Sequence, residues 1–428
     1  MKYNTQNSKI ASITEKTLIV GIDIGSQTHY ARAFDWRNYE YSRKAFVFSN
    51  DKEGFMAFKN WMDEIAEKYN KEVVIPGMEP TGHYWFGLGM FLQDIGMRPV
   101  HVNPHHVKKS KELDDNNPNK NDRKDPKTIA ALVNEGRFSY PYIPTGIYAE
   151  IRNLSNLRFQ TQEQITRIKN RIARWFSIYF PEYKDVYGKL DALSGIMILK
   201  QAPLPKDIMK LGVDGVNKIW REAKLRAVGI KRAKILVNKA EHSIGSHEAP
   251  EAARVELQML LSDYEMYHQR MEELMNTIEE KLYEVPYIDK LLEIKGIGMI
   301  TICGFIAEVG DIRRFDNPKQ LQKLAGYAIV SNDSGKHNGE SRISYRGRKR
   351  LRYVLYEAAI SLIGKNDEFQ EIHHYYQTRE INPLKKMQSV IAVACKVIRI
   401  FYTILTKGVT YDGEKMLKDI KRPVEAMN

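Results

Sequence analysis

The chain has 428 residues, of which 43% are hydrophobic and 28% are charged, a balance typical of a folded protein with two or three domains. Its 66 Lys and Arg residues exceed its 53 Asp and Glu residues by 13, and this surplus indicates a polyanionic partner, either nucleic acid or an anionic membrane. No apolar run reaches the roughly 18–20 residues that span a bilayer, and residues 1–16 are too polar for a secretory signal. A membrane partner is therefore disfavoured, and a cytoplasmic location is expected. The two cysteines, Cys303 and Cys395, lie in apolar helical stretches and offer no Cys-based zinc spacing.

The N-terminal part, residues 1–145, is predicted to alternate strands and helices. Apolar and β-branched runs predict strands, and 3.6-residue periodicity predicts helices. The expected strands are 17–24, 28–35, 41–49, 72–78 and 98–102, and the expected helices are 51–69 and 84–95. Three strands in a row followed by helix, strand, helix and strand is the order of an RNase H-like fold. The polar stretch 107–123 is predicted to be a loop, with another helix starting at Asp125.

The remaining sections are predicted to be mainly helical, so the expected fold class is α/β plus all-α. In the middle region, residues 146–287, two segments at 151–179 and 260–278 show heptad-like apolar seams. These seams could pair as an antiparallel hairpin, pack in an intramolecular bundle, or join subunits. Residues 202–239 between them look less regular. The C-terminal region, residues 288–428, is predicted to contain helices at 299–309, 347–363 and 385–406.

Two acidic residues stand at the ends of predicted strands. Asp23 closes the first strand between Gly21 and Gly25, and Glu79 closes the fourth. In the expected fold these two strands are neighbours, so the two carboxylates meet at one sheet end and repel each other unless a cation lies between them. Carboxylate oxygens suit Mg²⁺ or Mn²⁺.

Two further acids, Asp122 and Asp125, lie three residues apart at a predicted helix start and can face one direction. Three of the four acids have an ordinary alternative: Asp125 before Pro126 is a natural N-cap, Asp122 a loop acid, and Asp23 a turn acid. The convergence of four acids at element ends favours a divalent-metal site for phosphodiester chemistry.

A Gly-x-Gly turn at Gly296 and Gly298, preceded by Lys295, separates two apolar helical segments within residues 291–311. This pattern matches a helix–hairpin–helix, which presents backbone N–H groups to a DNA phosphate without reading sequence. A plain interhelical turn is the commoner explanation of such a short pattern.

Residues 341–352 contain six cations and no acid, which indicates polyanion contact, although a solvated helix face is the alternative. The six predicted nucleic-acid contacts in this basic block are Arg342, Arg346, Arg348, Lys349, Arg350 and Arg352. Ser334 precedes the block on a Ser–Gly turn, and its local composition alone gives it only a structural role.

In combination, these motifs resemble the DEDD-type transposases of insertion-sequence family 110 and related DNA invertases. The matching stretches include GIDIGSQ, MEPTGHY, NDRKDP, IKGIGMITICGFIAEVGDIRRF, LAGYAIVSNDSG and RISYRGRKRLRYVLYEAA. The resemblance implies a RuvC-like domain whose acids Asp23, Glu79, Asp122 and Asp125 bind Mg²⁺ (or Mn²⁺). It also implies a C-terminal transposase domain in which Ser334 is the nucleophile of a serine recombinase.

The resemblance further implies donor and target DNA as substrates, a structured guide RNA and a homo-oligomer, a dimer or a tetramer. Two features depart from the pattern or compete with it: Pro126 replaces the usual small residue after the last acid, and Ser331 rivals Ser334. A RuvC-like, metal-dependent junction-resolving endonuclease and a non-catalytic nucleic-acid-binding scaffold are the alternative functions.

Overall fold

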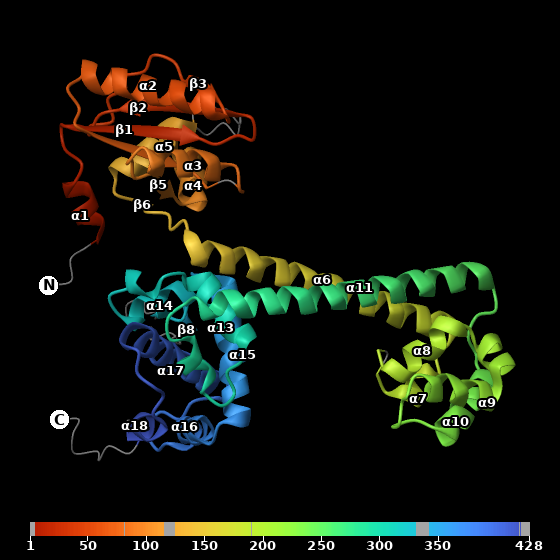
Figure 1. Cartoon of the computed structure of the whole chain (residues 1–428). Coiled ribbons are helices and arrows are strands. Elements are labelled where there is room, and N and C mark those ends of the chain that lie inside the picture. Colours follow the sequence, from red (N-terminus) through yellow and green to blue (C-terminus); the bar gives the residue numbers. More distant parts are fainter. Residues whose placement is uncertain are drawn as a thin grey trace. The chain divides into compact units, whose positions relative to one another are not determined.

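The computed structural model describes residues 5–80, 82–114, 125–189, 191–330, 342–418 and 420. The chain divides into two compact units, Met1–Ile143 and Pro144–Asn428, and each is considered by itself (Figure 1). Asp122, Ser331 and Ser334 lie outside the described residues.

The N-terminal unit is built on one mixed six-stranded sheet with the order β3-β2-β1-β4-β5-β6. Strand β1 pairs antiparallel with β2 and parallel with β4, which in turn is parallel to β5. The strands are β1 Thr17–Asp23, β2 Thr28–Phe34, β3 Phe46–Ser49, β4 Val73–Met78, β5 Val100–Val102 and β6 Phe138–Ser139. This mixed α/β arrangement fits a DEDD nuclease-like fold. The third strand is shorter than predicted, because residues 41–45 lie outside regular structure.

Helices cover both faces of this sheet. One face packs on α2 (Lys52–Lys68) and α3 (Trp85–Asp94), and the other packs on α5 (Asp125–Asn134). Because strand side chains alternate between faces, Leu18, Val20 and Ile22 of β1 join the first core while Ile19 joins the second. A short helix, α1 (Thr5–Ala11), precedes the sheet.

The prediction of a loop from residue 107 was wrong over residues 107–114, because α4 spans Pro104–Asp114. Three local features explain this helix despite its polar sequence. Pro104 occupies the first helical position, where its missing N–H costs nothing; the Asn103 Oδ1 accepts from the His105 N–H at 2.9 Å; and Val107 is buried. The polar composition of residues 107–114 did not distinguish a loop from a helix, since an exposed helix needs few buried apolar residues.

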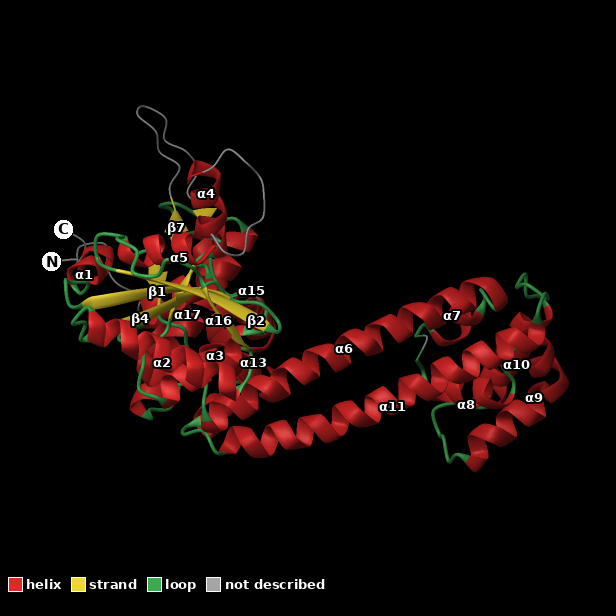
Figure 2. Ribbon diagram, turned by 90° about the horizontal axis from the view of Figure 1, so that it is seen from above, coloured by secondary structure: helices red, strands yellow, loops and turns green. Residues whose placement is uncertain are grey.

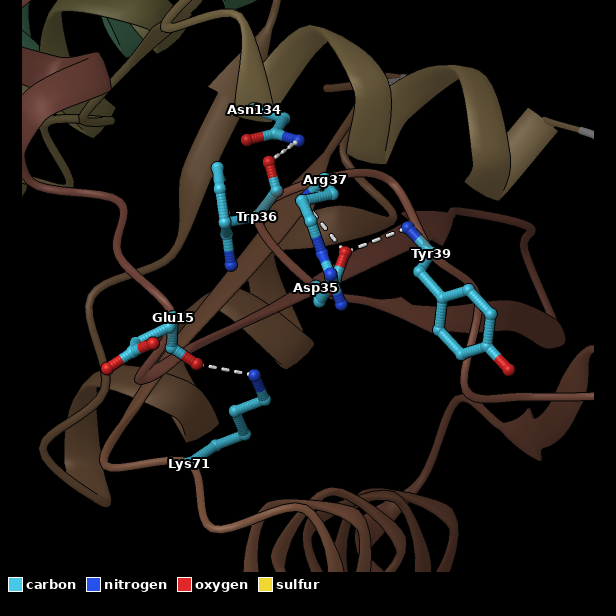
Figure 3. A network of polar contacts seen from close by, with 7 residues as sticks. All are labelled: Glu15, Asp35, Trp36, Arg37, Tyr39, Lys71 and Asn134. Atoms are coloured by element: carbon cyan, nitrogen blue, oxygen red, sulfur yellow. Dashed lines mark hydrogen bonds and ion pairs between the residues drawn. The ribbon is translucent and has the colours of Figure 1, made fainter.

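The connection between β2 and β3 is organised around the buried Asp35 (Figure 3). Its Oδ1 accepts from the backbone N–H groups of Arg37 and Tyr39, both at 2.8 Å, and its Oδ2 pairs with the Arg37 guanidinium. The Asn134 amide at the end of α5 donates to the Trp36 carbonyl at 2.6 Å. This turn therefore ties the end of α5 to the sheet.

In the C-terminal unit, two 34-residue helices, α6 (Gly146–Tyr179) and α11 (Pro250–Tyr283), pack against each other (Figure 2). The two heptad seams therefore meet within one chain. Ile168 and Leu260 lie in one core of this unit, whereas Ile151 and Ile278 lie in another. The sequence left open whether these seams pair within one chain or join subunits, and in this structure they pair within one chain.

The segment between these two helices forms a helical subdomain, here called the helical head. Its helices are α7 Tyr183–Tyr187, α8 Leu193–Gln201, α9 Pro205–Glu222 and α10 Ile230–Glu241. Residues 202–239 are thus mostly helical, with a break inside α9 at Gly212, whose φ is 67°. Positive φ is accessible to glycine because it lacks a Cβ.

The rest of the unit is a helical core with a two-stranded sheet. Its elements are α12 Ile288–Leu292, α13 Met299–Val309, η1 Ile312–Arg314, α14 Pro318–Ala325, β7 Ile329–Val330, β8 Arg342–Ile343, α15 Lys349–Lys365, α16 Asp367–Thr378, α17 Lys386–Lys407 and α18 Gly413–Lys418. Among the described helices, α17 is long and apolar enough to cross a membrane, but residues such as Val393, Val397 and Phe401 are buried in this core. Its apolar character is accounted for by packing.

Candidate active site

Asp23 and Glu79 stand at the carboxyl ends of two adjacent parallel strands. The register pairs Thr17 with Val73 and continues to Ile22 with Met78, and Asp23 and Glu79 are the residues that directly follow this last pair. Residues in register on neighbouring strands point to the same face. Both acids are half-buried. The structure thus confirms that these strands are neighbours and that the two acids share one sheet end.

The shared face is the one covered by α5. A Cβ on Gly21 would lie 1.9 Å from the Pro126 carbonyl oxygen, and a Cβ on Gly77 would lie 2.5 Å from the Val133 Cγ2. Asp23 and Glu79 each follow one of these glycines by two residues, so alternation directs their side chains to the same face. The glycines allow α5 to approach the sheet closely at this point.

Asp125 is the first residue of α5 and is half-buried. Because Pro126 contacts Gly21, the start of this helix lies beside the strand that ends at Asp23. The structure therefore brings the acid at the helix start toward the sheet end that carries the other two. The fourth acid, Asp122, lies outside the described residues.

The donor chemistry of these acids fits a hard divalent cation, since all of them offer carboxylate oxygens. Among the described residues, however, no group of three or more His, Cys, Asp and Glu side chains lies together closely enough to hold a metal ion. Asp23, Glu79 and Asp125 therefore do not complete a ligand set by themselves. Metal binding remains a proposal.

The loop after Asp23 is held by two residues that the sequence analysis missed. The buried His29 accepts at Nδ1 from the Gly25 N–H at 3.3 Å, and burial lowers the pKa of His29, which favours its neutral form. Asn50 donates to the Ser26 carbonyl at 3.1 Å, and its backbone N–H donates to the Gln27 carbonyl at 2.8 Å. The inward position of His29 in the alternation of β2 was the available signal.

His101 on β5 is half-buried and packs against α3. Its ring lies edge-on to Trp85, with centroids 4.2 Å apart, and its Nε2 is buried without a hydrogen-bond partner. Burial lowers the pKa of His101 to about 4, so the ring is neutral near pH 7.

The Gly-x-Gly turn joins α12 to α13. Gly296 has a φ of 103°, and its carbonyl accepts from the Ser361 hydroxyl at 2.7 Å, which fixes the turn on α15. Lys295 and Gly298 are exposed, and nothing lies within 4 Å of a Cβ built on Gly298. The turn thus presents an open surface beside a lysine, as a phosphate contact requires.

The six cations of the basic block fall into two groups. Arg348 donates to the Glu308 carbonyl at 2.9 Å, Arg352 donates to the Ala325 carbonyl at 3.0 Å, and Arg350 bonds the Asn156 side chain. Arg350 is nevertheless exposed. Arg342, Arg346 and Lys349 are exposed too, and within the described residues their side chains make no hydrogen bond or ion pair. The second group is therefore the more accessible part of the predicted nucleic-acid surface.

Comparison with known proteins identifies the class. A model of the DEDD transposase domain of the IS110 family, described as transposase, matches residues 20–181, and a model of the transposase IS116/IS110/IS902 family matches residues 288–377. The first match contains the four acids, and the second contains the Gly-x-Gly turn and the basic block. The fold and these domains define an enzyme that acts on DNA.

Three relatives narrow the identification. An uncharacterised 44.8-kDa protein of insertion element IS116 from Streptomyces clavuligerus is 22% identical over 300 residues, covering 67% of this chain and 71% of the relative. An uncharacterised 42-kDa protein of IS900 from Mycobacterium paratuberculosis is 23% identical over 296 residues, covering 67% and 72%. The transposase for IS1111A from Coxiella burnetii is 27% identical over 122 residues, covering 28% and 34%. This chain carries the two domains of an IS110-family transposase of an insertion element.

Proposed function

We propose that this transposase cuts and rejoins DNA through a serine–phosphate intermediate, with an acidic metal site formed by Asp23, Glu79, Asp122 and Asp125 and with Ser334 as the nucleophile. The observation that carries the proposal is that Asp23 and Glu79 directly follow the last register pair of two adjacent parallel strands, close to the start of α5. Two carboxylates at neighbouring strand ends are most stable with a cation between them.

Each group has a defined part in the proposed reaction. A divalent cation such as Mg²⁺ or Mn²⁺ would polarise the phosphate and stabilise the charge that develops on its oxygens. The carboxylates of Asp23 and Glu79 would hold that cation, and Asp122 and Asp125 would add oxygen ligands. The Ser334 hydroxyl would lose its proton to a nearby base as its oxygen bonds to phosphorus and displaces a deoxyribose oxygen.

The serine ester conserves the energy of the phosphodiester bond. Attack by a free deoxyribose hydroxyl on the ester then rejoins DNA, returns the proton to the serine oxygen and requires no ATP. We propose that a structured RNA from the element directs this exchange, because the net charge of +13 and the exposed Arg342, Arg346 and Lys349 suit RNA and DNA phosphates. Two DNA duplexes must be held at once, which favours a symmetric oligomer acting on DNA in the cytoplasm.

Strand transfer by Ser334→Ala and Ser331→Ala variants tests the nucleophile. Loss of the covalent protein–DNA adduct with Ser334→Ala, but not with Ser331→Ala, is the expected result. Undiminished cleavage by Ser334→Ala would instead favour a junction-resolving endonuclease that uses water. Asp23→Asn is expected to abolish cleavage while leaving DNA binding intact; unchanged recombination in that variant would leave a non-catalytic scaffold as the better explanation.

A further inference from the structure

A dense basic surface lies on the helical head, in the part of the chain between the two matched family domains. Residues 223–240 contain six Lys and Arg residues and no Asp or Glu. Five of these cations are exposed, and one of them, Arg232, lies over the Tyr187 ring at 5.9 Å. The other four lie at the turn between α9 and α10 and on the first part of α10, and together they are called the α9–α10 basic face: Lys224, Arg226, Lys231 and Lys234.

The charge of this face is not neutralised by the protein. Two other cations in or beside the head are paired: Lys239 with Asp185 at 2.6 Å and Lys169 with Asp191 at 2.7 Å. Within the described part of the chain, none of the four cations of the basic face takes part in an ion pair. A surface that keeps its positive charge uncompensated attracts a polyanion.

The basic face rests on a packed scaffold. Ala233, Leu236 and Ala240 of α10 are buried in the core of the head, while Lys231 and Lys234, three residues apart, lie on the opposite, solvent-facing side. Trp220 near the end of α9 is buried, and its indole N–H donates to the Ser194 carbonyl at 2.8 Å. The cations are therefore displayed from fixed helices.

The placement of these cations does not favour helix stability. The first turn of α10 contains no acidic residue, although the N-terminal end of a helix is partly positive and is stabilised by negative charge. Lys231 therefore adds positive charge where the helix already carries some. A bound polyanion would offset this cost.

We propose that the α9–α10 basic face binds the phosphate backbone of duplex DNA. Helices α9 and α10 and the turn between them offer no exposed aromatic ring for stacking on unpaired bases. Trp220 is the one aromatic residue of residues 205–241, and it is buried. Lysine and arginine contacts to phosphates are independent of sequence. The face would hold duplex DNA of any sequence and would leave sequence selection to other parts of the complex.

The salt dependence of binding tests this proposal on the full-length protein. The probes are a random-sequence duplex DNA and, in a separate arm, the structured RNA from the element's non-coding end. The double variants Lys224→Gln/Arg226→Gln and Lys231→Gln/Lys234→Gln are each expected to weaken duplex binding about tenfold or more at low salt. Each is also expected to reduce the slope of log affinity against log salt by about 2, since each lost phosphate contact removes about 0.9.

Lys206→Gln/Lys210→Gln is the matched control. These two exposed lysines lie in the first part of α9, away from the turn, and their replacement removes the same charge from the same subdomain. The control is expected to keep the wild-type slope. No variant is expected to lower the melting temperature, because the side chains are exposed and the cations of the basic face do not favour helix stability. The proposal would be overturned if the control lost as much duplex affinity and salt slope as the two double variants. It would also be overturned if the double variants lost affinity only for the RNA probe.

Discussion

Gly21 of β1 and Pro126 of α5 approach so closely that a Cβ on Gly21 would lie 1.9 Å from the Pro126 carbonyl oxygen. The same Cβ would lie 2.9 Å from the Ala130 backbone nitrogen, so both obstacles belong to the main chain. This contact fixes the distance between the strand that ends at Asp23 and the helix that begins at Asp125. The position of two acids thus depends on the absence of one methyl group.

We expect Gly21→Ala to displace the start of α5. Overpacking of this kind costs about 1–3 kcal/mol of unfolding free energy, and the shift of Asp125 is expected to reduce strand transfer beyond the loss of folded protein. Urea unfolding and single-turnover cleavage at saturating protein measure the two effects. Gly87→Ala on α3 is the control, because its Cβ would meet ring atoms of Phe55 at an ordinary 3.6 Å. Normal cleavage by folded Gly21→Ala would contradict this role of the contact.

Removal of one carboxylate is expected to separate metal binding from folding. In metal-free buffer, Asp23→Asn relieves repulsion with Glu79, so its melting temperature is expected to equal or exceed that of the wild type. Addition of Mg²⁺ at a hundredfold excess over its dissociation constant is expected to stabilise the wild type by about 2.7 kcal/mol, but not the variant. Calorimetry with and without chelator measures this, with the exposed Asp94→Asn as the control. An identical response of Asp23→Asn and wild type would exclude Asp23 as a ligand.

The turn at Asp35 is expected to contribute acid-sensitive stability. Burial by itself would raise the pKa of Asp35, but hydrogen bonds from Tyr39 and Arg37 outweigh it and lower the pKa. The carboxylate therefore stabilises the fold above the unfolded-state pKa of about 3.9, and this contribution is lost as the pH falls through the lower folded-state value. Asp35→Asn is expected to cost about 1–3 kcal/mol at pH 7.

Urea unfolding of wild type and Asp35→Asn at neutral and strongly acidic pH checks this expectation. The difference between the two proteins is expected to shrink in acid, when the wild-type carboxylate is protonated. The exposed Asp63→Asn on α2 is expected to show little difference at either pH. A gap between wild type and Asp35→Asn that stays constant with pH would rule out the charged side chain as its source.

His101 gives a second pH effect in a different window. An unfolded histidine is protonated below about 6.5, whereas the pKa of folded His101 is about 4. Between these values the unfolded state binds the extra proton, so stability is expected to fall as the pH is lowered from 6.5 to 4. His101→Phe keeps an aromatic ring beside Trp85 and is expected to flatten this fall, measured as the urea midpoint against pH. Parallel curves for wild type and variant would show that His101 does not titrate in this range.

The two groups of arginines in the basic block are expected to differ in function. Arg348→Gln removes hydrogen bonds to Glu308 and is expected to lower the unfolding free energy by about 1 kcal/mol. Arg346→Gln is expected to leave stability unchanged and to reduce the salt slope of DNA binding by about 1. Thermal melts and binding titrations on both variants distinguish the roles. If Arg348→Gln and Arg346→Gln changed the melting temperature and the salt slope of DNA binding equally, the division into a structural and a DNA-binding arginine would be wrong.

The sequence by itself determined the elements that depend on local pattern. The β-branched run of β1 and the apolar periodicity of α2 predicted their bounds to within about one residue, because burial of one face dictates side-chain spacing. The expected RNase H-like fold also made the first and fourth strands neighbours, and with them Asp23 and Glu79. The helix α4 was missed because its few apolar anchors gave no periodic signal.

Only the tertiary structure decided which surfaces pack against other parts of the same chain. The seams of α6 and α11 face each other within one chain, and Arg348 and Arg352 are bound to backbone carbonyls, although sequence spacing treats paired and unpaired cations alike. The close packing of α5 on Gly21 likewise depends on contacts between residues far apart in the chain. The buried position of His29 depends on contacts between residues on opposite sides of a turn. Local pattern sets which residues are apolar or charged, but long-range packing decides which partner each one meets.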